Sequence, residues 1–199
     1  MKKISTVVAG LILTSSSMMA MDIEYFVGAG AERTKSNLEL KADDGNDSSN
    51  QFDTALKIKA GIILDKIHRA YISYSKPSEN WSYSEPGFSE GGKKSITQVL
   101  INYDYLLPIT EDFRIGGGVH LGLSKVEHKY SNSDNESAKF SDNGLAYGVQ
   151  IAAIYDITKN VEFELGLGHT RYTAEMKYDD AKEKLKYTTS AYAGLNFKF

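Results

Sequence analysis

Apolar and polar residues alternate with a period of two along almost the whole chain after its first twenty residues. In residues 51–65 an apolar ladder of alternate positions runs opposite Lys57 and Lys59, as in a strand with one apolar face. The same pattern predicts eight strands, at residues 22–33, 51–65, 69–76, 94–106, 113–127, 143–156, 161–172 and 185–199. Most of them have the roughly 9–11 residues that a tilted strand needs to cross a membrane.

The connections between these segments alternate strictly between long and short. Residues 34–50, 77–93, 128–142 and 173–184 are long and polar, whereas 66–68, 107–112 and 157–160 are short. Long outer loops with short periplasmic turns are typical of an outer-membrane barrel. We therefore predict an all-β fold: an eight-stranded antiparallel up-and-down transmembrane β-barrel with four long outer loops and three short periplasmic turns.

The aromatic residues provide an independent test of the strand directions. A membrane barrel carries an aromatic girdle at each interface. We expect one girdle at the short-turn end, formed by Tyr25, Tyr103, Tyr105, Phe113, Tyr155, Phe163, Phe197 and Phe199. We expect the other girdle nearer the opposite end, formed by Phe52, Tyr74, Tyr147 and Tyr187. After the first twenty residues no apolar run reaches the length of a spanning helix, so a membrane interpretation leaves only a barrel.

The first twenty residues read as an export signal. Lys2 and Lys3 precede an apolar stretch, residues 4–13, and a small polar stretch ends at Ala20. The alternative is a retained membrane anchor, but the apolar run is too short to span a bilayer. We predict residues 1–20 as a signal peptide and 21–199 as the barrel domain, with export to the bacterial outer membrane.

Composition excludes several classes of protein. The chain has no cysteine, which rules out disulfides and thiolate metal sites. Its formal net charge of -3 provides no basic footprint, so nucleic acid is not an expected partner. We expect no cofactor and no metal site.

The last strand contains the most specific motif. The motif consists of a polar or aromatic residue, a glycine and alternating aromatic residues that end in Phe. Its residues here are Tyr192, Gly194, Phe197 and Phe199. The chain thereby resembles the small eight-stranded outer-membrane barrels of the OmpA/OmpX type from Gram-negative bacteria. That resemblance implies that these residues are recognised by the barrel-assembly machinery. The alternative is an ordinary last strand that ends in Phe.

The inward positions of the predicted barrel carry charges of both signs. An eight-stranded barrel is narrow enough for side chains to fill its interior, and buried charges must pair. We predict that a polar network inside the barrel neutralises these charges, formed by Lys57, Lys59, Arg114, Glu24, Glu162 and Glu164. The network is interpreted either as structural packing or as the gate of a small conductance.

The outer loops contain the remaining candidates for function. Trp81, Tyr83 and Phe88 are exposed contact residues or pack against their own loops. His169 and Arg171 meet lipopolysaccharide phosphates or are simply interfacial. A lipid A deacylase is expected to have a histidine and a serine two residues apart on one strand face. No histidine of this chain has a serine two residues further on.

The expected function is therefore structural or surface-interacting and adhesion-like, through the outer loops. Expected partners are outer-membrane lipids and lipopolysaccharide, the barrel-assembly machinery, and a host or envelope surface. A narrow channel for ions or small solutes is the alternative. A lipid-active enzyme is the third hypothesis, and we assign no catalytic residue.

Overall fold

The computed structural model describes residues 22–42, 45–85, 88–132, 137–177 and 181–199. Within these ranges the side chains of residues 40–42, 45–49, 83–85, 88–90, 131–132, 137, 176–177 and 181–182 are left out of the description. The predicted signal peptide lies outside the described residues. In the part of the chain that the structure describes, no helix is long and apolar enough to cross a membrane.

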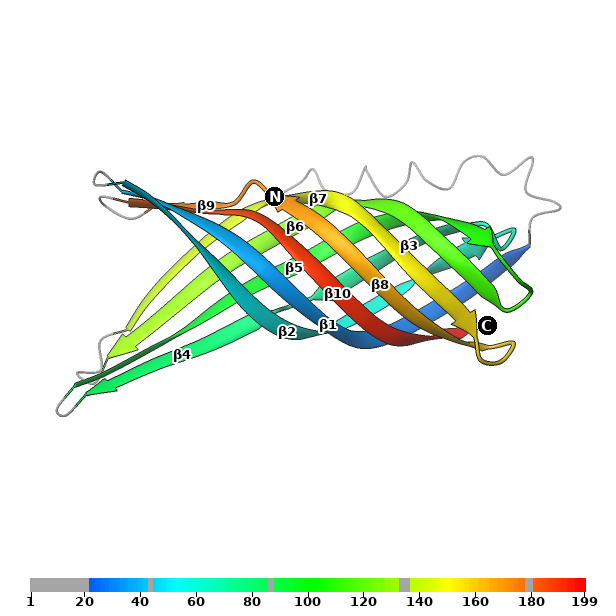
Figure 1. Ribbon diagram of the computed structural model, residues 1–199, viewed down its shortest axis with the longest axis horizontal. Helices are drawn as coiled ribbons and strands as arrows, with labels where there is room; N and C mark the ends of the chain where they lie inside the picture. The colour runs from blue at the N-terminus through cyan, green and yellow to red at the C-terminus, as the bar shows by residue number, and fades with distance from the viewer. Residues whose placement is uncertain (1–21, 43–44, 86–87, 133–136, 178–180) are drawn as a thin grey trace, which may run out of the picture.

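Antiparallel strands form one closed, tilted ring (Figure 1). The described segments are β1 (Ile23–Ala42), β2 (Gly45–Leu64), β3 (His68–Ser75), β4 (Ser78–Glu85), β5 (Phe88–Pro108), β6 (Phe113–Asn132), β7 (Ser137–Asp156), β8 (Val161–Tyr172), β9 (Glu175–Lys177) and β10 (Ala181–Lys198). The ring runs β1-β10-β8-β7-β6-β5-β3-β2 and closes by pairing β2 with β1. The predicted eight-stranded barrel is confirmed.

Two of the eight barrel strands are interrupted on the outer side. β4 continues β3 after Lys76 and Pro77, where proline has no N–H to donate to a ladder. Instead the Pro77 carbonyl accepts a hydrogen bond from the Ile96 amide at 3.0 Å. β9 continues β8 after Thr173 and Ala174 and pairs with β10.

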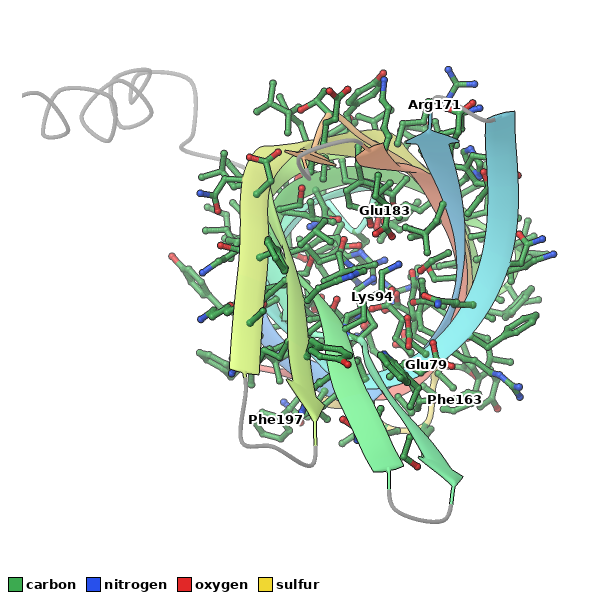
Figure 2. The ribbon with its side chains drawn as sticks, turned by 90° about the vertical axis from the view of Figure 1, so that its left-hand side faces the viewer. Glu79, Lys94, Phe163, Arg171, Glu183 and Phe197 are labelled. Atoms are coloured by element: carbon green, nitrogen blue, oxygen red, sulfur yellow. The ribbon has the colours of Figure 1, made fainter. Side chains whose placement is uncertain are left out.

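The period of two in the sequence separates an apolar outer surface from a polar interior. On β2, Ile58 and Leu56 are exposed while Lys57 and Lys59 are buried. Such exposed apolar side chains form a belt that faces lipid. The belt on β2 runs from Ile62 to Leu56, with Phe52 at the outer interface. At the other interface, Phe163 and Phe197 lie on the outer surface of the ring (Figure 2).

Short turns join the strands at the end that carries the C-terminus (Figure 1). The β2–β3 turn places both Asp65 and Lys66 at positive φ, 51° and 61°. Two successive positive φ angles define a type I′ turn, whose twist suits a tight hairpin. The other two turns close with amides of Ile109 and Ile157 bonded to the carbonyls of Phe113 and Val161, at 2.9 Å each. The three predicted short turns are confirmed.

The predicted outer ends of the strands are wrong. β1 does not stop at residue 33 but continues to Ala42, and β2 begins at Gly45 rather than residue 51. The other outer connections likewise consist mostly of strand. Apolar alternation ends where the membrane ends, but backbone N–H and C=O groups still need partners, and hairpin ladders provide them in water.

Beyond the membrane the wall divides into two outer sheets, which diverge at the left of Figure 1. We name the outer parts of β9, β10, β1 and β2 the first outer sheet. The outer parts of β4, β5, β6 and β7 form the second outer sheet. Their separation follows from where pairing ends: β2 meets β4 only at Thr54–Ser78, and β7 meets β8 only as far as Ala146–Tyr172.

Candidate functional site

Arg69 is the centre of the charge network inside the barrel. Its guanidinium lies 2.6 Å from Asp104 Oδ2 and 2.8 Å from Glu164 Oε2, and the side chain is completely buried. Lys59 Nζ reaches the same Glu164 oxygen at 2.5 Å. Two cations therefore face two anions, which is the balance that a buried ion cluster needs.

Neutral side chains occupy further hydrogen-bonding positions of this cluster. Gln150 donates to Asp104 Oδ1 at 2.6 Å and to the Tyr71 hydroxyl at 2.7 Å. Tyr192 donates its hydroxyl proton to Glu164 Oε1 at 3.0 Å. The carboxylates therefore keep the partners that make their burial tolerable.

A second ion cluster lies toward the periplasmic end. Arg114 is 2.5 Å from Glu162 and 2.7 Å from Asp156. Lys198 lies 3.1 Å from Asp156, 3.2 Å from Glu162 and 3.9 Å from Glu24. The two clusters are connected by Asn196, whose amide donates to Glu162 at 3.2 Å and to Glu164 at 2.8 Å.

Lys57 forms a separate pair on the outer side of Arg69. Its ammonium lies 3.6 Å from Glu32 Oε1 and 4.2 Å from the centre of the Tyr192 ring. An aromatic face attracts a cation, so Tyr192 contributes to the positions of both Lys57 and Glu164.

The structure brings the predicted network residues into the lumen, but the pairing differs in part from the prediction. Glu24 faces Lys198 at the periplasmic rim, and Lys57 faces Glu32. Sequence reasoning missed Arg69, Asp104 and Lys198 as members. The period of two could have found them, because each lies between outward residues: for example, Asp104 lies between Tyr103 and Tyr105.

Two layers of buried apolar side chains lie inside the barrel, and the inner one adjoins the Arg69 cluster through Tyr71. The outer layer consists of Leu38, Ile96, Leu100, Val126, Ala146, Tyr172, Ala174 and Leu185. The inner layer consists of Phe26, Ile63, Tyr71, Leu106, Ala152 and Ile154. Buried apolar side chains exclude water, so these layers together with the paired charges oppose a continuous aqueous path.

The filled lumen predicts that the wild-type protein conducts no ions. Purified protein inserted into a planar bilayer should give a flat current trace across voltages, equal to that of a protein-free detergent control. Stepwise currents whose size changes on Arg69→Leu substitution would show instead that the charge network lines a conducting path.

The residues of the predicted assembly signal lie on both faces of the last strand. Phe197 and Phe199 face outward, and their rings stack at 6.2 Å. Phe199 also stacks on Tyr25 of β1 at 6.2 Å. Tyr192 faces the lumen instead. Recognition of Tyr192, Gly194, Phe197 and Phe199 by the assembly machinery stays a prediction.

Of the predicted outer contact residues, Trp81 is described in full. It is exposed, and its ring lies 6.2 Å from that of Tyr130 on β6. The backbone of Tyr83 and Phe88 lies in β4 and β5, but their side chains lie outside the described part. A hollow of about 240 Å³ on the second outer sheet is lined by Trp81, Lys93, Lys94, His128, Lys129, Tyr130 and Phe140.

Lysines surround the next part of the same sheet. A shallower hollow of about 520 Å³ is lined in part by Lys93, Lys129 and Lys139. Lys139 approaches Glu127 at 3.0 Å, and its hydrogen bond, with help from the neighbouring lysines, lowers the pKa of Glu127 to about 2. Glu127 is therefore a carboxylate at any physiological pH, and it offsets only one of these charges.

The four histidines contact groups that do not form a nucleophilic arrangement. His68 lies 2.8 Å from the Tyr103 hydroxyl and His120 2.9 Å from Thr170. His128 lies 3.6 Å from Glu183, and His169 3.2 Å from Thr189. Arg171 points away from the ring at its outer rim, as Figure 2 shows.

Comparison with known proteins gives the family. The model of the outer membrane protein beta-barrel domain matches residues 7–199. No curated protein was found to match the chain.

Among solved structures, the chain is similar to Ail, the attachment invasion locus protein of Yersinia pestis, in complex with the heparin analogue sucrose octasulfate. The TM-score is 0.58 at 17% identity, and the match covers 89% of this chain and 99% of Ail. Neisserial surface protein A has a TM-score of 0.57 and 15% identity, covering 88% of this chain and 97% of its own.

The outer membrane protease OmpT from Escherichia coli is also similar, with a TM-score of 0.52 and 12% identity, over 93% of this chain and 100% of OmpT. At such identities the likeness shows a shared fold. The match of the family model over nearly the whole chain shows that the protein belongs to the outer membrane protein beta-barrel domain family, which places it in the bacterial outer membrane.

Proposed function

We propose that this protein is a surface-interaction protein, adhesion-like in character, whose barrel anchors two outer sheets for contact with a host or envelope surface. The observation that carries the proposal is the length of the strands. β1, β2, β6 and β7 each have 20 residues, about twice what crossing the membrane requires. The additional length lies at the outer end, while the lumen is filled by ion pairs and apolar layers.

The second outer sheet has the chemistry of a contact surface. Trp81 exposes 44% of its surface beside the hollow that Lys93 and Lys129 also line. Exposed tryptophan is enriched at the energetic centres of interfaces. Lysines beside an aromatic side chain favour an anionic polymer, because sulfate or carboxylate groups meet the lysines while the aromatic ring stacks on a sugar.

The structural neighbour Ail is in complex with a heparin analogue, a highly sulfated sugar. That complex belongs to Ail and supports the choice of probe for this chain. We infer that a sulfated or carboxylated glycan is the class of partner. Outer-membrane lipids and lipopolysaccharide surround the belt and the interfacial Arg171, and the assembly machinery recognises the last strand.

Binding of whole cells to immobilised heparin tests the proposal. Cells that display the wild-type protein should bind heparin-coated wells and not dextran-coated wells. Trp81→Ala should weaken binding roughly tenfold, since a central aromatic contributes at least about 1.4 kcal/mol. Lys93→Gln combined with Lys129→Gln should give a loss of about the same size.

Lys66→Gln is the matched control, because it removes one positive charge from the periplasmic turn. It should leave binding unchanged. Equal binding by wild-type cells and by cells that lack the protein, or equal losses for Lys66→Gln and the outer lysines, would contradict the proposal.

A further inference from the structure

The ladder between β2 and β4 stops abruptly at its first pair, Thr54–Ser78. Neither strand ends there. β2 remains paired with β1 out to Ala42–Gly45, and β4 remains paired with β5 out to Glu85–Phe88. The wall is therefore open between two strands that both have the extended conformation needed to pair. We call this gap the β2–β4 seam.

The residues at the next position of the seam explain why it opens. If the antiparallel register of Thr54–Ser78 continued, Asp53 would lie directly opposite Glu79. Both side chains belong to the inward face, because their neighbours Thr54 and Phe52 face outward and Glu79 pairs with the buried Lys94 on β5. Like charges directly opposite each other in a strand pair are destabilising.

Lys94, which interacts electrostatically with both carboxylates, is already engaged. Lys94 Nζ donates to Gln51 at 3.0 Å and to Glu183 at 3.4 Å. Figure 2 shows Glu79, Lys94 and Glu183 at the outer end of the barrel, with Lys94 inside the ring. Asp53 is 3% exposed, and its Oδ1 accepts no hydrogen bond within the described protein.

Other charged groups face the seam from every neighbouring strand. They are Glu79 from β4, Lys94 from β5, His128 from β6 and Glu183 from β10, while Glu32 and Lys57 pair with each other deeper in the lumen. Burial lowers the pKa of His128, so its ring adds no positive charge at neutral pH. The two opposed acids therefore share Lys94, which already bonds Gln51 and Glu183.

We propose that the opposed carboxylates of Asp53 and Glu79 hold the β2–β4 seam open, and that neutralising either one lets the two strands pair further and close the outer wall. The device is a charge latch at one pair of positions. The distance between Phe52 and Asn80, the next opposed pair in the continued register, is long when the seam is open and short when it is closed.

Acid is the natural neutralising agent. Burial raises the pKa of Asp53, Glu79 raises it further, and Lys94 lowers it. Because the pKa of Asp53 lies above its ordinary value of 3.8, Asp53 takes up its proton at a milder pH than an exposed aspartate. The seam is open above this pKa and closes as the pH falls through it.

Disulfide trapping at a fixed pH tests the latch directly, because the chain has no cysteine of its own. Phe52→Cys and Asn80→Cys together place two thiols where continued pairing would bring the strands within disulfide range. In isolated outer membranes at pH 8, Glu79→Gln should raise the disulfide yield about three- to fivefold over the same pair in the wild-type background. Glu79→Lys, which places opposite charges face to face, should raise it more.

Reversing both charges separates electrostatics from simple disruption. Asp53→Lys combined with Glu79→Lys restores repulsion and should return the yield to the wild-type level. Thr54→Cys with Ser78→Cys serves as the reference pair, since it is already paired and should cross-link fully in every background. Glu39→Gln, which neutralises a carboxylate on β1, should change nothing.

Acid closure is measured with nitroxide labels on the two introduced thiols. Their separation should shorten between pH 8 and pH 4 with Asp53 and Glu79 in place and should be short at both pH values with Asp53→Asn. The proposal is overturned by yields that are equal in all charge backgrounds while the reference pair cross-links, or by a label distance that does not respond to pH.

Discussion

Replacing Arg69 with leucine should destabilise the barrel by about 3–5 kcal/mol, the usual cost of removing one partner from a buried ion cluster. Arg69 is completely buried and bonds both Asp104 and Glu164. In its absence Glu164 keeps Lys59, whereas Asp104 loses its guanidinium partner and keeps the hydrogen bond from the neutral Gln150. Denaturant unfolding of protein refolded into phospholipid vesicles measures this loss.

Two companion variants identify the cause of that loss. The quadruple variant Arg69→Leu, Asp104→Leu, Glu164→Met and Lys59→Met removes both cations and both anions of the cluster. Such charge-free replacements of buried ion clusters are often neutral or stabilising, so this variant should recover most of the stability. Lys125→Leu, on the exposed outer surface, should change stability by less than about 0.5 kcal/mol. A loss as large for Lys125 as for Arg69 would show that general charge content, not the buried cluster, is responsible.

Replacing Gly166 with valine should cost about 1–3 kcal/mol through overpacking. A side chain at Gly166 would run into the ring of Tyr192 on the neighbouring strand. That ring is not free to move, because its hydroxyl bonds Glu164 and its face meets Lys57. The substitution therefore disturbs the packing of both charged side chains as well as the ring.

Gly117→Val is the matched control for Gly166→Val. Gly117 lies on the outward face of β6, and a Cβ there would meet nothing within 4 Å. Glycine inside a strand is unfavourable by about 0.5–1 kcal/mol, so valine at this position should leave stability unchanged or raise it. The temperature at which each variant loses its compact gel mobility ranks the two substitutions, and equal shifts would refute the role given to Tyr192.

The sequence by itself determined the strand count, the strand faces and the three short turns. The alternation of apolar and polar residues predicts these features because successive side chains of a strand point to opposite sides. One side faces lipid, and the other faces the lumen. Lys57, Lys59 and Arg114 were therefore placed inside the barrel from their neighbours alone. The same rule applied to Arg69 would have placed the centre of the network as well.

Only the tertiary structure decided which charges pair and how far the strands extend. Arg69 meets Glu164 from a distant strand, so their contact depends on how the ring closes and on the lengths of side chains that cross the lumen. The outer sheets are formed by polar residues whose ladders satisfy backbone groups rather than apolar faces, and hydrophobic patterning does not report on such ladders. The β2–β4 seam also depends on register: Asp53 and Glu79 are 26 residues apart in the chain, and only strand pairing makes them opposite neighbours.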